Sequence, residues 1–392
     1  MTPGARVQAA IEILDLVIAA ARANGAPADR IVSEWFRTRR FAGSKDRRAV
    51  RDLVYAAIRA CGPVPASGRA AMLLVARDDA ALASLFDGQG HGPAAISVGE
   101  PIAAGGVVPA WLEKALAESD IAGDDALALL ARAPLDLRVN TLKADRDTLE
   151  LPQPGEPGLA PQSLRLPHGT QVEGWEAYLS GQVEVQDIGS QLVCSALGAQ
   201  PGELVIDLCA GAGGKTLALA AAMDNRGRLI ATDTDRARLS RLEPRAWRAG
   251  ITIAETRLLD PNREAAALAD LVGQADAVLV DAPCSGTGTW RRSPEGRWRL
   301  TPDQLGRYAA VQARLLDLAA TLLRPGGRLG FVTCSLLDVE GAGQAAAFLA
   351  RHPDWSAQDL HLGAGTPRGP GLRLAPSRDG TDGFFVACFR KT

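Results

Sequence analysis

Apolar side chains recur every three or four positions along the first 22 residues, which is the spacing of one face of an α-helix. Asn24-Gly25 and Pro27 carry the turn chemistry that ends such a helix. The same spacing predicts further helices around residues 31–36, over about 46–60, and once or twice within 67–86. Residues 1–86 are therefore predicted to form a helical domain.

The helical pattern does not continue past this first domain. Residues 87–108 contain six Gly and two Pro and predict a linker or a long loop. The next stretch, 109–181, predicts a mixed segment with a helix from Pro109 and a short strand near 135–140. Its proline-rich part, residues 151–169, is predicted to be irregular.

From residue 182 to the end, short apolar runs alternate with segments of helical spacing. This alternation predicts an α/β domain over 182–392, built on a doubly wound and mainly parallel sheet. The predicted strands are 204–208, 228–232, 252–257, 276–281, 328–333 and 383–390, and the predicted helices are 188–198, 214–223, 235–249, 263–271, 303–323 and 338–351.

The charge of the chain is nearly balanced, with 43 Lys and Arg against 45 Asp and Glu among 392 residues. This balance excludes a uniformly basic surface, so any nucleic-acid site must be local. The six cysteines form no C-x-x-C pair and do not cluster with the four histidines, which disfavours a zinc site or a disulfide scaffold. No apolar stretch is long enough to span a membrane. We therefore expect a cytoplasmic protein without a metal or a membrane partner, and we expect it to be a monomer.

The first strand of the α/β domain runs into a glycine-rich turn, LCAGAGGKT (208–216). A P-loop would need Gly at Cys209, and the dinucleotide-binding pattern would need Gly at Thr216, so neither phosphate motif is present. Acidic residues also stand at or near the ends of the first four strands: Asp207, Asp233, Asp260 and Asp281. A glycine turn followed by such acids favours a nucleoside cofactor without phosphates, although a plain tight connection between strand and helix is the alternative.

Two cysteines follow the strands predicted at 276–281 and 328–333. A right-handed crossover through the helix between them would make these parallel strands neighbours, so Cys284 and Cys334 would face one crevice. The alternative is that each is a small buried apolar residue, the usual fate of a free cysteine. A thiolate has a specific use beside a nucleoside site, because its addition to carbon 6 of cytosine makes carbon 5 nucleophilic enough to accept a methyl group. The later removal of the proton from carbon 5, which lets the thiol leave, gives a second cysteine a purpose.

Several motifs resemble those of the RNA cytosine-5 methyltransferases that use S-adenosylmethionine. They are LCAGAGGKT (208–216), DAPCSGTG (281–288) and TCS (333–335), with VQDIGSQL (185–192), DGFFVACF (382–389) and PLDLRVNTLK (134–143) as further similar segments. The resemblance is strong over about 110–392 and weak over 1–86, and it is closest to members that act on small-subunit ribosomal RNA. It implies a Rossmann-like methyltransferase sheet. It also implies methyl transfer from S-adenosylmethionine to carbon 5 of a cytosine in ribosomal RNA, through a covalent cysteine–cytosine intermediate.

The resemblance implies a role for each catalytic residue. Cys334 would be the nucleophile, and Cys284 would serve release of the methylated product. Asp281 and Lys215 would lie at the target base, and Lys215 is also the best candidate in the motifs for the positive charge that a thiolate requires.

The resemblance likewise implies a cofactor site. Asp233 would hold the ribose, and Asp260 would lie near the adenine. The family usually has Ala-Pro where this chain has Gly211-Ala212, a departure that loosens the turn without removing a chemical group. The implied site comprises Cys209, Ala210, Gly211, Ala212, Gly213, Gly214, Lys215, Asp233, Asp260 and Asp281.

Two basic clusters are candidate RNA contacts. Residues 37–51 hold seven Lys or Arg against one acid, and a solvated helix face is the alternative. The second cluster follows the DAPCSGTG motif and is predicted to contact phosphates and to stack on bases through Trp290, Arg291, Arg292, Arg297 and Arg299. The helical domain over 1–86 resembles the NusB-type RNA-binding fold.

Other functions remain open on the sequence. One is cytosine-5 methylation of transfer RNA, and another is a non-catalytic RNA-binding assembly factor that keeps a residual methyltransferase fold. The intact Cys284 and Cys334 argue against the second of these. A methyltransferase of small molecules is a third alternative, but it needs neither paired cysteines nor a basic loop.

Overall fold

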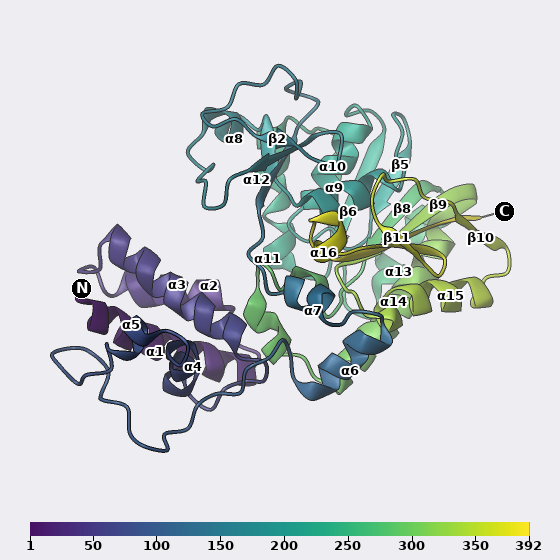
Figure 1. The fold of residues 1–392 in the computed structure, drawn as a ribbon. Coiled ribbons are helices and arrows are strands. Elements are labelled where there is room, and N and C mark those ends of the chain that lie inside the picture. Colours follow the sequence, from purple (N-terminus) through teal and green to yellow (C-terminus); the bar gives the residue numbers. More distant parts are fainter. Residues whose placement is uncertain (392) are drawn as a thin grey trace. The chain divides into compact units, whose positions relative to one another are not determined.

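The computed structural model describes residues 1–391, which divide into two compact units (Figure 1). The first unit contains residues 1–131 and 289–301, and the second contains residues 132–288 and the chain from 302 on. This division differs from the expected domains in two ways. The helical region extends beyond residue 86, and a short segment between the two cysteine motifs belongs to it.

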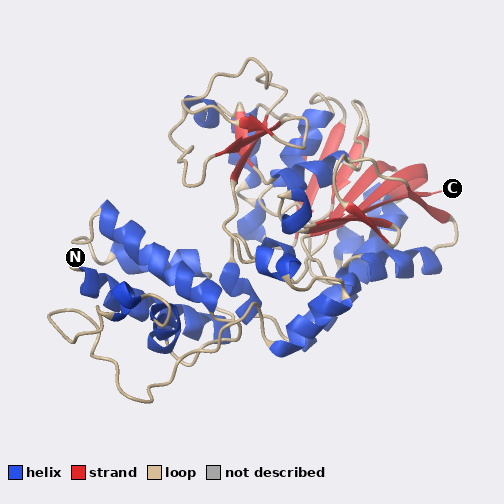
Figure 2. Ribbon diagram, viewed as in Figure 1, coloured by secondary structure: helices blue, strands red, loops and turns tan. Residues whose placement is uncertain are grey.

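The first unit is helical in all of its regular structure (Figure 2). The apolar stripe predicted on the first helix is buried, and this helix packs against α3 and α4. Its contact with α4 is close, because a Cβ added at Gly68 would collide with the carbonyl oxygen of Ile11. The helices are α1 (Pro3–Arg22), α2 (Ala28–Arg37), α3 (Ser44–Ala60), α4 (Gly68–Ala76), α5 (Ala80–Ala83), α6 (Ala110–Glu118) and α7 (Asp124–Ala128), and the 3-10 helix η3 (Pro294–Trp298) completes the unit.

The second unit is built on a large sheet with strand order β11-β12-β13-β9-β8-β5-β6-β7, and β10 pairs with β13. The five strands from β9 to β7 in this order are parallel, whereas β13 is antiparallel to β9. Each of the six predicted strands overlaps a strand of this sheet, so the predicted α/β fold is confirmed. The strands are β5 (Leu204–Asp207), β6 (Arg228–Asp233), β7 (Ala254–Leu258), β8 (Ala275–Asp281), β9 (Leu323–Thr333), β10 (Trp355–Gln358), β11 (Thr366–Arg368), β12 (Gly371–Leu374) and β13 (Phe384–Lys391).

Helices cover both faces of this sheet, as the doubly wound arrangement requires. One apolar core includes side chains of α9, α10 and α12, and the other includes side chains of α14 and α15. The helix predicted over 235–249 is divided in two at residues 240–241. The helices of this unit are α8 (Glu176–Leu179), α9 (Ile188–Ser195), α10 (Gly214–Ala222), α11 (Arg236–Leu239), α12 (Leu242–Ala249), α13 (Glu264–Ala267), α14 (Pro302–Leu322), α15 (Ala342–Arg351) and α16 (Pro376–Asp379), with the 3-10 helices η1 (Ala269–Leu271), η2 (Thr287–Thr289) and η4 (Asp338–Glu340).

A second, antiparallel sheet has the order β2-β3-β1-β4. Two of its strands lie within residues 151–169, so the prediction that this stretch is irregular is wrong there. Pro157 is tolerated because β2 is an edge strand, where a missing N–H interrupts no ladder. The strands are β1 (Leu135–Val139), β2 (Glu156–Pro157), β3 (Ser163–Leu166) and β4 (Val183–Val185).

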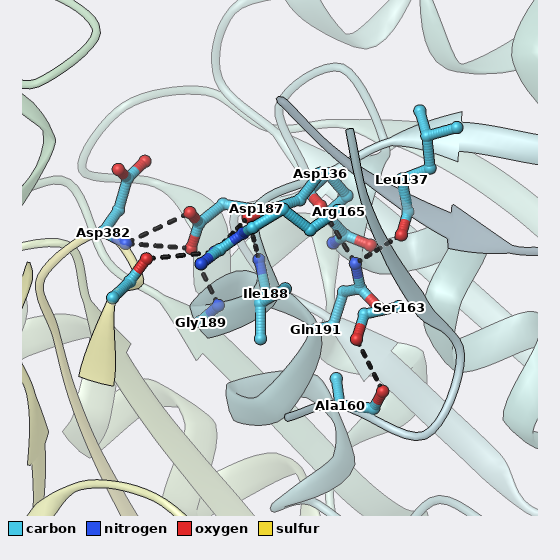
Figure 3. A network of polar contacts seen from close by, with 12 residues as sticks. Asp136, Leu137, Ala160, Ser163, Arg165, Asp187, Ile188, Gly189, Gln191 and Asp382 are labelled. Carbon is cyan, nitrogen blue, oxygen red and sulfur yellow. Dashed lines mark hydrogen bonds and ion pairs between the residues drawn. The ribbon is translucent and has the colours of Figure 1, made fainter. Parts of the chain in front are cut away.

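A buried polar network attaches this small sheet to the large α/β sheet and its helices (Figure 3). Arg165 on β3 forms a two-pronged ion pair with Asp136 on β1, at 2.7 and 3.1 Å. Asp136 also accepts from the backbone N–H of Ile188 at the start of α9. Asp187, the N-cap of α9, accepts from the N–H of Asp382 just before β13. The network therefore joins the small sheet to the start of α9 and to the segment that leads into β13.

Candidate active site

Four predicted acids gather at the carboxyl edge of the large sheet. Asp207, Asp233 and Asp281 are the last residues of β5, β6 and β8, and Asp260 follows β7 by two residues. These strands are parallel neighbours, so their carboxyl ends lie along one edge. Strand β9 is the parallel neighbour of β8, with Asp281 in register with Val332. This places the segments that follow β8 and β9 at the same edge.

The turn between β5 and α10 has a backbone conformation that glycine adopts readily. Gly211 and Gly213 have φ of 57° and 86°, values that L side chains rarely adopt, and Gly213 caps α10 without a side-chain hydrogen bond. A Cβ added at Gly214 would meet no atom within 4 Å. Asp233 accepts from the N–H of Gly211 at 2.7 Å. Each of its oxygens retains a lone pair for a ligand hydroxyl, because each accepts one backbone hydrogen bond here. The open space beside Gly214 and the adjacent acid fit a nucleoside cofactor.

Two arginines outside the turn hold its carbonyl groups. Arg245 on α12 donates to the carbonyl oxygen of Ala212 at 2.6 Å. The buried Arg138 on β1 donates to the carbonyl oxygen of Gly214 at 3.1 Å and to Gln186 at 2.5 Å. The sequence reasoning did not assign these roles. The only available signal was that Arg138 lies in the PLDLRVNTLK segment.

Asp207 differs from the other acids because it is fully buried. The hydroxyl of Thr216 on α10 donates to one of its oxygens at 2.7 Å. Burial raises the pKa of Asp207 to about 7. Asp207 therefore joins β5 to the first turn of α10 from inside the protein.

Lys215 and Asp281 form an ion pair, with Nζ 2.7 Å from Oδ2. Burial lowers the pKa of the Lys215 ammonium, but the charge and hydrogen bond of Asp281, together with nearby cysteines, outweigh burial and raise the pKa above its ordinary value. The ring of Phe384 also lies 5.6 Å from Nζ. Lys215 is therefore a fixed positive charge beside Asp281.

The structure brings the two predicted cysteines together. The Sγ atoms of Cys284 and Cys334 lie 3.3 Å apart, within hydrogen-bonding distance for sulfur, and both residues are half-buried. The hydrogen bond with Cys334, together with burial, raises the pKa of the Cys284 thiol well above its ordinary value. The structure therefore favours Cys284 as a protonated thiol within hydrogen-bonding distance of the Cys334 sulfur.

Sequence reasoning also missed a buried carboxylate close to the thiols. Glu340 on η4 is fully buried and contacts Ser285 and Ser335, the residues that follow the two cysteines. An acid six residues after Cys334 was visible in the sequence, but nothing local indicated that it would be buried.

The structure corrects the expectation of an exposed basic loop over 290–299. Trp290, Arg291 and Arg297 are buried, so they cannot face RNA from the surface. The guanidinium of Arg297 donates to the carbonyl oxygens of Ile58 and Cys61 at 2.5 and 2.7 Å. This segment is therefore mainly part of the packing of the helical unit.

The other residues of this segment follow the same trend. Trp298 belongs to the core of the helical unit. Arg299 is half-buried and donates to the carbonyl oxygens of Gly25 and Ala26 at 3.0 and 2.8 Å. Arg292 is half-buried, and its contact with RNA stays a prediction. The cluster over 37–51 is mostly exposed, and its role also stays a prediction.

Comparison with known proteins identifies the family. Residues 194–390 match the sequence model described as 16S rRNA methyltransferase RsmB/F. The chain belongs to this family. It is 36% identical over 287 residues to ribosomal RNA small subunit methyltransferase B of Citrobacter koseri, covering 71% of this chain and 65% of that protein. The protein of the same name from Xylella fastidiosa is 38% identical over 267 residues, covering 66% and 62%. The chain thus spans less than two thirds of the length of these relatives.

Solved structures agree with this assignment. The crystal structure titled PH0851 superimposes with a TM-score of 0.77 at 25% identity, and the match covers 100% of this chain and 99% of the other. A methyltransferase homolog protein from Pyrococcus horikoshii has a TM-score of 0.59 at 25% identity and covers 72% and 99%. The predicted resemblance, the Rossmann-like methyltransferase fold and S-adenosylmethionine as the cofactor are therefore confirmed.

Two further properties of the described residues bear on possible partners. Within residues 1–391, His, Cys, Asp and Glu side chains form no group of three or more that is arranged to hold a metal ion. In the same part of the chain, every helix is too short or too polar to cross a membrane.

Proposed function

We propose that this protein transfers a methyl group from S-adenosylmethionine to carbon 5 of a cytosine in small-subunit ribosomal RNA, through a covalent bond between Cys334 and the base. Membership of the RsmB/F family and the names of the relatives support an RNA methyltransferase with a ribosomal target. The two thiols at neighbouring strand ends support the covalent chemistry. Carbon 5 of cytosine is a weak nucleophile that must first be activated, whereas methylation of an atom that is already nucleophilic would need neither thiol.

The single observation that carries the proposal is the 3.3 Å distance between the Sγ atoms of Cys284 and Cys334. The Cys334 thiolate adds to carbon 6 of the base, and carbon 5 becomes nucleophilic. Lys215 and Asp281, already paired, lie at ring nitrogen 3 and stabilise the charge that develops there. In the last step Cys284, once deprotonated, takes the proton from carbon 5. The electron pair left on carbon 5 re-forms the ring double bond, and the bond from carbon 6 to the sulfur breaks so that Cys334 leaves as a thiolate.

The bound cofactor supplies an electrophilic methyl group. The glycine turn and Asp233 hold it, with Asp233 accepting from the ribose hydroxyls and Asp260 near the adenine. Arg138 and Arg245 keep the turn in place from behind. The chain thus orients the methyl donor at the same sheet edge from which the thiols act.

Replacing each cysteine tests the proposal, because the two act at different steps. Cys334→Ala leaves no nucleophile, so methylation falls to background and no adduct forms. Cys284→Ala still permits addition and methyl transfer, so the enzyme accumulates bound to its methylated RNA. A denaturing gel shows this as a slower band that requires both RNA and S-adenosylmethionine.

Cys388→Ala is a matched control, because Cys388 is a buried thiol on β13 whose sulfur contacts the carbonyl of Ala196. It should leave turnover and adduct formation unchanged. Adduct formation by Cys334→Ala but not by Cys284→Ala would reverse the two roles. Unchanged turnover in both variants would show that the proposed chemistry is wrong.

The target is tested separately. Bisulfite sequencing of RNA from a strain lacking this gene should show the loss of one or more methylated cytosines in small-subunit ribosomal RNA. Loss confined to transfer RNA would favour the alternative substrate, and no loss in any RNA would favour a non-catalytic assembly factor.

A further inference from the structure

Glu340 is a fully buried carboxylate at the cysteine pair. It is the last residue of the short η4, six positions after Cys334. A buried carboxylate is costly unless several donors satisfy it. Glu340 has such donors, and they come from three separate segments of the second unit.

The donors to Glu340 lie directly beside the two thiols. Ser285, next to Cys284, donates its backbone N–H at 2.8 Å and also its hydroxyl. Ser335, next to Cys334, donates its hydroxyl at 2.6 Å. Glu340 therefore links the loop after β8 to the loop after β9.

A third donor comes from the crossover helix between these strands. Gln312 on α14 donates to Glu340 at 3.1 Å and to the carbonyl oxygen of Pro283 at 2.9 Å. Gln312 is fully buried as well. The contacts of Gln312 and Glu340 thus hold both neighbours of Cys284, Pro283 before it and Ser285 after it.

The short helix η4, which carries Glu340, is itself held by contacts with other strands of the unit. Asp338, two residues earlier on η4, forms ion pairs with Arg368 on β11 and Arg373 on β12. Gly341 packs on Phe385 so closely that an added Cβ would lie 2.8 Å from the ring. Glu340 therefore has little freedom to follow the loops if they move.

We propose that Glu340 is a positioning residue of the active site, which ties the two cysteine loops together and holds their sulfurs at hydrogen-bonding distance. This role rests on the proposed function, in which the two thiols act on one base. Glu340 touches neither the cysteine sulfurs nor the glycine turn by any hydrogen bond of the described residues, so it acts through Ser285 and Ser335.

The electrostatics agree with this geometry. The groups that face the Cys284 thiol are Cys334 after β9, Glu340 on η4 and Tyr308 on α14. The hydrogen bond with Cys334 and burial raise the pKa of Cys284 most, and the negative charge of Glu340 raises it further. Glu340 thus helps to keep Cys284 as the protonated partner.

The test uses the full chain with Glu340→Gln and Glu340→Ala. Glu340→Ala removes the tie, and we expect kcat for RNA methylation to fall roughly a hundredfold, the cost of a misplacement of about 1 Å. KM for S-adenosylmethionine should stay within about twofold, because the cofactor turn is untouched. Glu340→Gln keeps the shape and most of the hydrogen bonds, so it should recover part of this loss.

A second measurement does not depend on RNA. Iodoacetamide labels the thiols over a range of pH, and mass spectrometry of the peptides separates Cys284 from Cys334. Loss of the negative charge in Glu340→Gln should move the midpoint for Cys284 to lower pH. Glu264→Gln is the control, since Glu264 is also buried but pairs with Arg314 elsewhere in the unit.

The outcomes separate the two proposals. A shifted labelling profile in an enzyme that methylates no RNA would refute the proposed function and support the positioning role. Wild-type labelling and wild-type kcat in Glu340→Gln and Glu340→Ala would overturn the positioning role. If Glu340→Ala does not fold, the Cys284 labelling profile of Glu340→Gln tests the positioning role by itself: a wild-type profile overturns the role, and a shifted profile supports it.

Discussion

The backbones of Gly288 and Gly383 lie in direct contact, and the N–H of Gly383 donates to the carbonyl oxygen of Gly288 at 2.8 Å. A Cβ added at Gly288 would collide with the backbone carbonyl group of Gly383. The contact joins the end of the DAPCSGTG motif to the start of DGFFVACF. Gly288 also donates to the carbonyl oxygen of Cys334, so the contact supports the cysteine site directly.

Gly288→Ala should therefore lower the free energy of unfolding by about 1–3 kcal/mol, the usual cost of overpacking. Gly306→Ala is the matched control, because a Cβ at this position of α14 meets no atom within 4 Å. The control should be neutral or slightly stabilising, since Ala favours a helix more than Gly does. Urea unfolding of both variants checks this, and equal stability of the two would contradict the close approach.

Two glycines of the cofactor turn should respond differently to the same substitution. Gly211→Ala places a side chain at φ of 57° and should cost about 1–2 kcal/mol of stability. Gly214→Ala adds a Cβ in open space, so stability should hold while the affinity for S-adenosylmethionine falls. Thermal unfolding and titration calorimetry measure the two effects. Undiminished affinity in Gly214→Ala would place the cofactor away from this turn.

Asp233→Ala should weaken binding of S-adenosylmethionine by about tenfold or more, because hydrogen bonds to a charged acceptor contribute roughly 1.5–3 kcal/mol. Glu255→Ala is a suitable control, since it removes an exposed carboxylate that pairs with Arg228 on the neighbouring strand. Calorimetry on both variants is the measurement. Equal affinities would contradict the assignment of Asp233 to the ribose.

Arg297→Ala tests the correction to the basic segment. Loss of the guanidinium leaves the carbonyl oxygens of Ile58 and Cys61 without this donor, at about 1–3 kcal/mol for each unpaired group. We expect faster hydrogen exchange at the end of α3 and a lower melting temperature. If Arg297→Ala has normal stability and its RNA binding depends less on salt, Arg297 contacts RNA instead of stabilising the helical unit.

Asp207 should make stability depend on pH. Its pKa of about 7 lies above the ordinary 3.8, so between these values the folded protein binds more protons than the unfolded chain. Its contribution to stability therefore falls as pH rises from 4 to 7. The free energy of unfolding of Asp207→Asn minus that of the wild type should grow across this range and then level off. Urea unfolding at several pH values measures it, and a constant difference would contradict the raised pKa.

The sequence predicted the large sheet and the meeting of its two thiols because both depend on periodicity and chain topology. Buried parallel strands have continuous apolar runs, and a right-handed crossover makes β8 and β9 neighbours. That topology brings the loops that carry Cys284 and Cys334 to the same edge of the sheet.

What the sequence could not predict depends on distant partners. An Arg and Trp pattern is compatible with a surface or a core, and Arg297 is buried because acceptors more than 230 positions away receive its hydrogen bonds. Glu340 is buried where Ser285, 55 positions away, and Gln312, 28 positions away, supply hydrogen-bond donors. Strand β3 forms because β1 offers it an antiparallel partner, which the proline-rich composition around it conceals.

The path of the chain through residues 289–301 has a consequence for biosynthesis. Trp298 is part of the apolar core of the helical unit, and the other buried side chains of that core lie within the first 86 residues. That core therefore cannot be completed until the ribosome has translated and released residue 301, by which time β5 to β8 have also been made. A fragment that stops at residue 131 would lack this tryptophan and Arg297. The amino-terminal unit is the first to be synthesised. It can complete its core only after much of the second unit has emerged from the ribosome.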